Sequence, residues 1–531
     1  MKMKLIRNLA VALVFATSLT SCFKDLDLAP EYGLNAETVY SNPDNYIHVL
    51  AKLYAGFTMT GNKGPAGAAD IGGIDEGFSQ YTRVLWNLQE LPTDEAICGW
   101  NDPGMPEMNK MAWSPENPWV KGMYYRIYFE IAQCNEFIRN AADDKLSQRG
   151  FSESDVQRIR LYRTEARFLR ALTYYHLMDL YGHGPFIPED QGVGSYFPTE
   201  YSRQQLFTFI ESELIAIKDQ MGAPRFEYGR ADKAAVWTLL AKLYLNSKVY
   251  INTERYDECA AYCDSVINCG AYSIEDNYRY LFLTDNNLCS EVILPIICDG
   301  RFTQSYGGTT FLVHASVGGQ MLVADFGIAP GSGWAGLRAK RNLPLIFNDS
   351  LTDTRYNFFK NPPQIIDNTI LTTFTNGYGV TKWKNLDRAN NPGSDPTKTF
   401  VDTDFPMFRL ADIYLMYIEC ATRGAANLGI AQSRFQELQD KRRGAGASTS
   451  VLDVSSASQR MILDERMREL YWEGHRRTDL IRYGLFTSSS YVWPWKGGTL
   501  TGTAAPVHLD LYPIPSSDLT ANPNLTQNPG Y

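Results

Sequence analysis

The sequence feature that most constrains the fold is a long helical pattern over residues 152–185. Ser152 followed by Asp155 is typical of a helix start, and Gly182 with Pro185 is typical of a helix end. At 1.5 Å per residue the helix would be about 40 Å long. We therefore expect it to be a central scaffold element against which other helices stack. Its largely apolar face is formed by Ile159, Tyr162, Ala166, Leu169, Thr173, His176 and Leu180.

Other helical patterns occur on both sides of this one. They cover residues 46–57, 119–142, 202–221, 231–248, 255–268, 407–422, 430–441 and 458–475. Successive helix pairs with Ala and Tyr at their contacts are typical of tetratricopeptide-like stacking. Because the spacing is irregular and the full repeat consensus is absent, we interpret them as degenerate repeats. The predicted fold class is mainly α, a tetratricopeptide-like helical scaffold.

Two long stretches interrupt the helical periodicity. Residues 58–118 are rich in Gly, Pro, Asp and Trp, and residues 280–400 contain the strand-like VILPII and the Gly-rich runs YGGTTFLVHASVGG and GIAPGSGWAGLRA. Loop regions of this length inside a compact chain are usually functional. The sequence therefore predicts a single domain over residues 44–531, with a few short strands and two loop-rich binding inserts, 58–118 and 280–400.

The first residues predict the compartment. Three positive charges precede an apolar run over residues 9–16, which is too short to span a bilayer and is typical of a signal peptide. The run ends in Leu19-Thr20-Ser21-Cys22, which looks like the bacterial lipobox. We predict a lipoprotein signal peptide over residues 1–21, a lipid on Cys22 and a lipidated leash over residues 22–43. The alternative is a plain secretory signal followed by a chance cysteine.

Charge and composition exclude several classes of function. The net charge of −9 becomes −12 when residues 1–21 and their three positive charges are removed, which disfavours a duplex-binding surface. Cys259 and Cys263 lie four apart in a helical pattern without a Cys-x-x-Cys motif or a histidine partner, so metal chelation is disfavoured. No cofactor is expected; calcium stays open without a motif to support it. Since no later segment is apolar enough to span a membrane, the lipid alone would hold the body there.

Several stretches together resemble the SusD/RagB family, the surface lipoproteins of Bacteroidetes that cap a TonB-dependent outer-membrane transporter. The similar pieces are the lipobox with CFKDLDLAP, then EARFLRALTYYHLMDLYGHGP, GRADKAAVWTLLAKLYLN, FPMFRLADIYLMYIECA, ERMRELYWEGHRRTDLIRYG, YPIP and QNPGY. They cover nearly the whole chain in a specific order. The resemblance implies a helical fold whose tetratricopeptide-like pairs face a SusC-like transporter, on a protein anchored by lipid at the cell surface in the outer membrane.

Within the family, the loops DEG, RVLWNLQELPTDE, YGGTTFL and SGWAGLRA resemble those of the starch-binding member. A sugar ring has an apolar face and a rim of hydroxyls, so a glycan site needs aromatic rings together with charged or amide groups. The resemblance implies that Trp100, Tyr306 and Trp334 form an aromatic arc fitted to an α-1,4-glucan. It also implies that Asp75 and Arg83 bind hydroxyls, the arginine fork holding two neighbouring ones. The alternative for each ring is core packing.

The chain departs from the starch-binding member at two positions of this predicted site. Pro103 stands where that member has an asparagine, and Pro cannot donate a side-chain hydrogen bond. We predict that Asn101 or Asp102 takes its place. Cys98 replaces a second tryptophan.

The charged residues between Glu465 and Arg482 lie three or four apart and are interpreted as structural ion pairs. Neighbouring carboxylates, Asp75 with Glu76 and Asp94 with Glu95, point apart and do not indicate a glycosidase pair. The leading hypothesis is a non-catalytic lipoprotein that passes α-1,4-glucan to its transporter. The alternatives are a surface glycoside hydrolase, a SusD-like binder of a different glycan, and a helical adaptor whose aromatic rings are buried.

Overall fold

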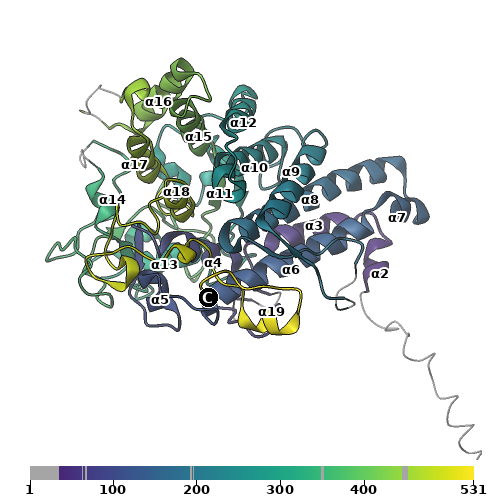
Figure 1. Ribbon diagram of the computed structural model, residues 1–531, viewed down its shortest axis with the longest axis horizontal. Coiled ribbons are helices and arrows are strands. Elements are labelled where there is room, and N and C mark those ends of the chain that lie inside the picture. Colours follow the sequence, from purple (N-terminus) through teal and green to yellow (C-terminus); the bar gives the residue numbers. More distant parts are fainter. Residues whose placement is uncertain are drawn as a thin grey trace, which may run out of the picture.

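The computed structural model describes residues 35–61, 64–65, 69–191, 194, 196–347, 352–444, 446 and 452–531. The predicted signal peptide, the lipidation of Cys22 and residues 22–34 of the predicted leash lie outside the described residues. The described part is mainly helical with a few two-residue to five-residue strands, which confirms the predicted fold class (Figure 1).

The central scaffold helix is α8, Glu153–Tyr181. Ser152 caps it by accepting a hydrogen bond of 3.2 Å from the backbone N–H of Asp155, and Gly182 ends it with a φ of 81°. Both helix boundaries confirm the prediction. From Thr164 to Tyr181 nearly every side chain is buried, because α3 (Asn45–Ala55), α6 (Pro118–Asn140) and α9 (Arg203–Ile217) all pack on it.

The remaining scaffold helices continue the array. Helix α12 (Tyr256–Asn268) packs between α10 (Lys233–Leu245) and α15 (Leu410–Thr422), and α15 packs on α16 (Leu428–Arg442). In Figure 1 these helices follow one another from α8 to α16. This order of packing agrees with tetratricopeptide-like stacking. Shorter helices border the array: α2 (Ala36–Tyr40), α7 (Asp143–Gln148), α11 (Ser247–Ile251) and α19 (Ser516–Ala521).

Two predicted helices were wrong at one end. The helix predicted from residue 407 begins at Leu410, because the preceding residues form β8 (Phe405–Arg409), antiparallel to β4 (Val292–Ile296). The helix predicted over 458–475 ends early: α17 covers Gln459–Leu470, and a separate helix, α18 (Arg476–Arg482), begins just after the predicted range. Between them Trp472 and Gly474 have φ angles of 64° and 80°, which a continuous right-handed helix does not allow. The strand prediction for VILPII is confirmed by β4.

The interpretation of residues 58–118 as loop alone was wrong. This insert contains α4 (Tyr81–Glu90), β1 (Ala96–Cys98) and α5 (Met105–Lys110). All ten residues of α4 are buried, so its polar residues lie in the protein interior together with the apolar ones. The apolar residues Tyr81, Val84, Leu85 and Leu88 do have helical spacing, but the run is short and stands among Gly-rich and Pro-rich segments. Helix α13 (Gly308–Ser316), in the second insert, is likewise buried at every residue. The Gly-rich run in which it lies is therefore a core helix.

The two inserts pair with each other through a short antiparallel ribbon. Strand β1 pairs with β5 (Leu337–Ala339), with Ala96 opposite Ala339 and Cys98 opposite Leu337. The ribbon continues past β1, where the N–H of Gly99 donates to the carbonyl of Gly336 at 2.9 Å. Helix α14 (Asn342–Leu345) follows β5. The other small sheets are β2 (Gly184–Pro185) with β3 (Glu200–Tyr201), and β6 (Phe358–Phe359) with β7 (Gly379–Val380).

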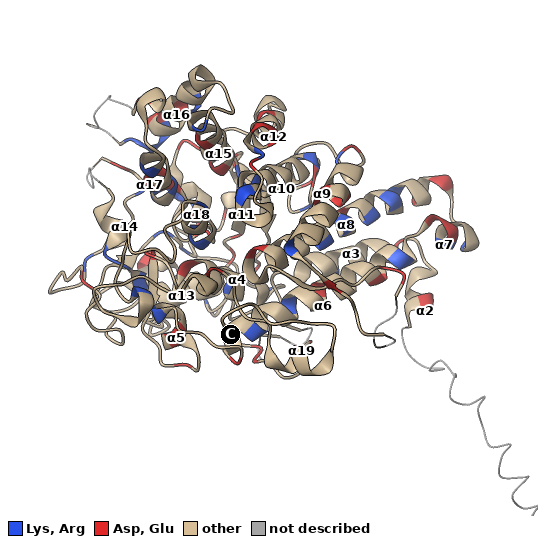
Figure 2. Cartoon of the chain, viewed as in Figure 1, with Lys and Arg blue, Asp and Glu red and all other residues tan. Residues whose placement is uncertain are grey.

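A buried ion-pair network joins these parts, and Arg409 is its centre. The Arg409 guanidinium lies 2.7 Å from Glu291, 2.7 Å from Glu469 and 2.6 Å from Glu473, and all four side chains are at most 1% exposed. Arg355 and Arg442 also contact Glu469. Figure 2 shows both charges mixed along α16 and α17. The interpretation of the charged residues between Glu465 and Arg482 as ion pairs is confirmed for those that the network and its neighbours bury: Glu465, Arg466, Glu469, Glu473, Asp479 and Arg482.

Within the described ranges, no helix has the length and apolar character needed to cross a membrane. The eight cysteines after Cys22 are free thiols. No group of histidine, cysteine or acidic side chains in the described part of the chain is arranged to hold a metal ion.

Replacing Glu469 by Ala should lower the free energy of unfolding by about 3–5 kcal/mol, because three buried guanidinium groups would lose their shared carboxylate. The control is Glu437→Ala, which removes the partly exposed partner of Arg434 and should cost about 0–1 kcal/mol. Chemical denaturation of both variants measures the difference. Equal losses would show that the network does not stabilise the fold as described.

Candidate functional site

The three aromatic rings singled out in the sequence lie together where the two inserts meet. Trp334 is central: its ring centroid lies 6.3 Å from that of Trp100 and 6.3 Å from that of Tyr306. The ring planes are tilted by 49° and 59°, so the rings do not form one flat platform. Each ring is half-buried. The alternative of full core packing therefore does not describe them.

The backbone pairing of the inserts fixes this cluster. Trp100 follows β1 by two residues and Trp334 precedes β5 by three, so the ribbon sets the rings side by side. The indole Nε1 of Trp100 donates to the carbonyl of Trp334 at 3.1 Å. A Cβ built on Gly336 would lie 2.3 Å from the Trp100 ring, so only glycine leaves room for this approach.

Arg83 packs against the cluster and binds the backbone of Tyr306. Its Nη1 donates to the carbonyls of Gly77 at 2.9 Å and Tyr306 at 3.0 Å, and its guanidinium lies 4.3 Å from the centroid of Phe311. The side chain is 7% exposed, and burial lowers its pKa to about 10. Its Nε is buried without a partner. The fork predicted to hold two hydroxyls is thus engaged by backbone, and Nη2 is the nitrogen left to reach a ligand.

Asp75 and Asn101 are exposed at the edge of the same region. One carboxylate oxygen of Asp75 accepts from the N–H groups of Gly77 and Phe78 at 2.7 and 3.1 Å, and its other oxygen makes no hydrogen bond with the described residues. Because Arg83 bonds Gly77, the turn that carries Asp75 is tied to the ring cluster. Asn101 makes no hydrogen bond with the described residues, so its amide is available.

Pro103, the departure noted above, has a structural role. Its carbonyl accepts from Nε1 of Trp119 at 3.0 Å, which fixes the loop that carries Asn101 and Asp102. Cys98 lies in β1, where it is 1% exposed, and burial raises the pKa of its thiol to about 12. It therefore presents neither a ring nor a reactive thiolate to the site.

His314 supports the site and was not singled out in the sequence. Its ring stacks on Trp334 with a centroid separation of 4.8 Å and a plane angle of 24°. Nδ1 lies 2.7 Å from the carbonyl of Ser332 and Nε2 lies 2.8 Å from that of Thr399. Burial lowers the pKa of His314, while the two carbonyls oppose this shift; a neutral ring donates to one of the carbonyls and a protonated ring to both. The partners are 18 and 85 residues away, so no local sequence pattern could reveal them.

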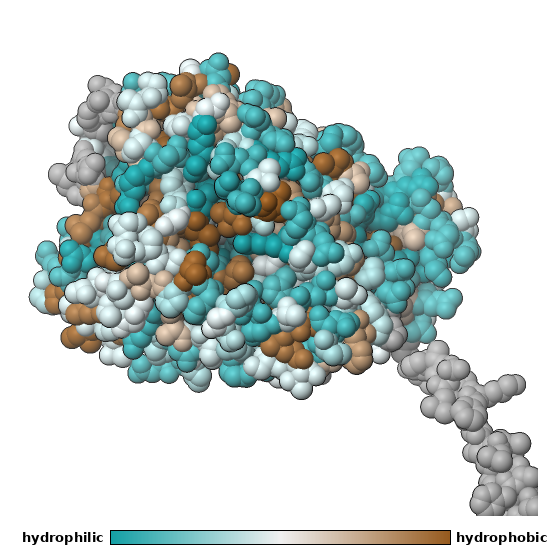
Figure 3. Space-filling view, in the orientation of Figure 1, coloured by the Kyte–Doolittle hydropathy of each residue, from teal (hydrophilic) through white to brown (hydrophobic). Residues whose placement is uncertain are grey.

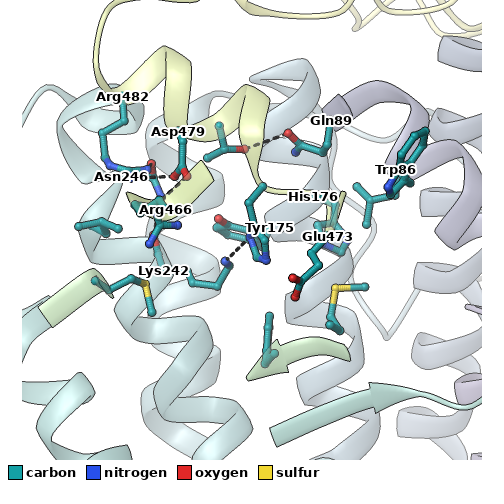
Figure 4. A pocket seen from close by; sticks show the side chains of 18 of the residues that line it. Trp86, Gln89, Tyr175, His176, Lys242, Asn246, Arg466, Glu473, Asp479 and Arg482 are labelled. Carbon is teal, nitrogen blue, oxygen red and sulfur yellow. Dashed lines mark hydrogen bonds and ion pairs between the residues drawn. The ribbon is translucent and has the colours of Figure 1, made fainter. Parts of the chain in front are cut away.

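A polar cavity, separate from the ring cluster, lies within the scaffold (Figure 4). Its volume is about 40 Å³, enough for a few water molecules and too small for a sugar ring. Lys242 Nζ lies 3.2 Å from Nδ1 of His475 and 3.0 Å from Asp412. Burial lowers the pKa of both His176 and His475 to about 3, so both rings are neutral near pH 7. We interpret this cavity as a hydrated structural centre.

Of the carboxylates considered for hydrolysis, Asp94 and Glu95 are buried and engaged by neighbouring residues. Asp94 makes two hydrogen bonds of 2.7 Å with Arg476, and although burial raises its pKa, Arg476 holds it below the usual value. Burial raises the pKa of Glu95 to about 7, the range of a general acid, but Glu95 is 2% exposed and accepts from the N–H of Trp472. Neither carboxylate can reach a polysaccharide from these positions. The ring cluster can offer stacking surfaces and a few polar groups, which suits binding.

The fold and the ring cluster place the chain among helical proteins built on tetratricopeptide-like pairs, with a site on the inserts. The comparison with the SusD family model matches residues 330–531. The chain is 33% identical to the starch-binding protein SusD of Bacteroides thetaiotaomicron, with all of both chains covered. It is 24% identical to the SusD-like protein P25 of Formosa agariphila over 98% of each. The chain belongs to the SusD family.

Solved structures agree on the fold. A SusD superfamily protein from Bacteroides thetaiotaomicron matches with a TM-score of 0.71 and 18% identity, covering 92% of this chain and 100% of that one. Surface glycan-binding protein A from Bacteroides fluxus matches with a TM-score of 0.69 and 18% identity, with the same coverage. At this identity the likeness shows the shared fold alone.

Replacing His314 by Ala should lower the free energy of unfolding by about 1–3 kcal/mol, since a buried carbonyl loses its donor and Trp334 loses its stacked neighbour. The exposed His48→Ala serves as control and should change it by less than about 0.5 kcal/mol. Urea denaturation compares the two variants. An unchanged His314→Ala would contradict the supporting role of the imidazole.

Proposed function

We propose that this protein is a non-catalytic glycan-binding lipoprotein of the cell surface that captures starch-type α-1,4-glucan. The observation that carries the proposal is the convergence of Trp100, Trp334 and Tyr306 at the junction of the two inserts, with Asp75 and Asn101 at their edge. Half-buried rings present apolar surface to sugar C–H faces, while the carboxylate, the amide and the arginine bind hydroxyls.

The geometry favours a curved glucan over a flat one. Successive ring planes are tilted by 49° and 59°, whereas a straight, extended glycan would need near-coplanar rings along its length. The naming of the 33%-identical relative as a starch-binding protein supports the same ligand class. A binder of a different glycan remains the second candidate. It is favoured by Pro103 and Cys98, which replace two groups of the starch-binding member.

We further propose that the protein delivers its glycan to a SusC-like TonB-dependent transporter in the outer membrane. Support comes from membership of the SusD family and from the predicted lipid on Cys22. A lipid at the end of a polar leash would keep the body at the membrane surface while leaving it free to reorient toward a partner. No cofactor enters this proposal.

Single alanine variants of Trp100, Tyr306 and Trp334 should each weaken maltoheptaose binding about fivefold, since a stacking ring contributes on the order of 1 kcal/mol. The matched control is Trp237→Ala, because Trp237 is also half-buried but lies on α10 in the scaffold. Isothermal titration calorimetry gives the affinities, and thermal melting confirms that each variant is folded. Wild-type affinity in all three ring variants would rule out the ring cluster as the site.

The same purified protein decides between binding and hydrolysis. We expect retardation on amylopectin gels without release of reducing sugar over hours of incubation. Release of reducing sugar that scales with protein concentration would establish the hydrolase alternative. A panel that includes a β-linked glucan and a mannan identifies the glycan if amylopectin does not bind.

Replacing Cys22 by Ala should release the protein from the membrane without changing its melting temperature, because the predicted lipid is attached at this cysteine. Fractionation of cells after a carbonate wash measures retention, and Cys269→Ala, a half-buried thiol within the fold, is the control that should stay bound. Equal retention of the Cys22→Ala protein would contradict the lipobox prediction.

A further inference from the structure

A cleft of about 630 Å³ lies beside α14, bordered by residues 367–369, the start of α17 and the segment 491–501. This volume is within the range of about 300–1,000 Å³ that small-molecule sites occupy. The cleft is open to solvent and is separate from the ring cluster. In Figure 3 the region of α14 shows hydrophobic residues among hydrophilic ones.

The two arginines that line the cleft are each paired with a carboxylate. Arg341 pairs with Asp367 at 3.0 Å, and both side chains are 50% exposed. Arg460, also on the wall, pairs with Asp464 at 2.7 Å. The Arg341–Asp367 pair presents guanidinium donors next to carboxylate acceptors, an arrangement suited to neighbouring hydroxyls, whereas Asp464 lies outside the lining. Since both guanidinium groups are already paired with carboxylates, they are less available to a phosphate or a carboxylate ligand.

Aliphatic side chains complete the walls. Leu345 is 57% exposed, Leu500 is 41% exposed and Val492 is 38% exposed, and all three line the cleft. Apolar groups of this size cover the C–H faces of a sugar. Asn342 and Thr369 also line the cleft; because Asn342 Nδ2 donates to Tyr491 and Val492 and the Thr369 hydroxyl donates to Asn376, both side chains can only accept from a ligand. This mixture of exposed apolar surface and paired charged groups suits a neutral oligosaccharide.

The cleft and the ring cluster share one loop. Thr369 lines the cleft. Two residues further along the chain, the Leu371 carbonyl packs against Gly99, the neighbour of Trp100: a Cβ built on Gly99 would lie 2.9 Å from this carbonyl oxygen. Phe374, further along the same loop, packs close to Ala335, which is the neighbour of Trp334. Both residues lie within 3.0 Å of a Cβ built on Gly318. The residues between are mostly exposed. A few extended residues span on the order of 10–20 Å, a distance that one oligosaccharide chain can cover.

We propose that the cleft at α14 is a second subsite, which binds a neutral oligosaccharide segment of the same chain that the ring cluster holds. The inference rests on the proposed function and names a further binding site for it. Once the rings hold one part of a polysaccharide, the next part reaches the cleft at high effective concentration. The second contact therefore strengthens binding of long glycans and contributes little to short ones.

The test fills the cleft without touching the rings. Thr369→Trp places a large side chain at an exposed wall position, and Thr208→Trp, at an exposed position on α9, is the matched control. A second variant, Arg341→Ala with Asp367→Ala, removes one ion pair without changing net charge. Calorimetric affinities are measured for maltotriose, which is short, and for amylopectin, which is long, with thermal melting to confirm folding.

We expect both cleft variants to bind amylopectin about tenfold more weakly than wild type and to bind maltotriose equally well, with Thr208→Trp unchanged for both. Wild-type affinity for amylopectin in folded cleft variants would overturn the second subsite and leave the proposed function intact. An equal loss for both ligands would also overturn it, since the variants would then act through the rings. If the wild type binds neither glucan nor any other neutral glycan, the subsite and the proposed function both fall.

Discussion

The structure depends on one buried carboxylate–guanidinium network, centred on Arg409. This residue ends β8 and contacts Glu291, just before β4, together with Glu469 and Glu473 near the end of α17. Although burial raises the pKa of Glu469, the guanidinium groups of Arg442, Arg409 and Arg355 hold it well below its usual range. A buried charge without its partner destabilises a protein by several kcal/mol. The network therefore disfavours misfolded arrangements of these segments more strongly than it adds net stability to the native fold. It thereby fixes the second insert and the C-terminal helices relative to the scaffold.

The geometry of the ring cluster depends on how the two inserts are held against each other. Trp100 and Trp334 are 234 residues apart, yet one hydrogen bond joins them directly. The β1–β5 ribbon sets their spacing, and a slip of one residue would send alternate side chains to the opposite face. Lys340, which follows β5, donates to the carbonyls of Leu91 and Thr93 from a fully buried position. This contact ties the ribbon to the end of α4 and resists such a slip.

The comparison of sequence and structure shows where periodicity carries information. Helix α8 was predictable because its exposed first turns and its cap signals mark its boundaries. Helix α13 was not, since burial on every side removes the polar face on which a periodicity argument depends. Helix α4 has apolar residues at helical spacing, but the run is short and its Gly-rich and Pro-rich surroundings led to its interpretation as loop. The resemblance to the SusD/RagB family placed Trp100, Tyr306 and Trp334 in one site, and the structure brings these rings together. The resemblance could not show that Nη1 of Arg83 donates to two backbone carbonyls, or that His314 stacks on Trp334, because both features depend on contacts between residues far apart in the sequence.

Partial burial of the rings has a physical consequence for ligand capture. A fully exposed ring would lose conformational freedom when it binds a sugar, whereas a ring fixed from behind has already lost it during folding. Trp334 is held by His314, Trp100 by its indole hydrogen bond, and Tyr306 by Phe400 at a centroid distance of 5.6 Å and by the bond from Arg83 to its carbonyl. Such a surface selects ligands whose shape already fits its tilts. Strong affinity for a flexible polysaccharide must then come from additional contacts along the chain, which is the physical reason to expect more than one subsite on a rigid site of this size.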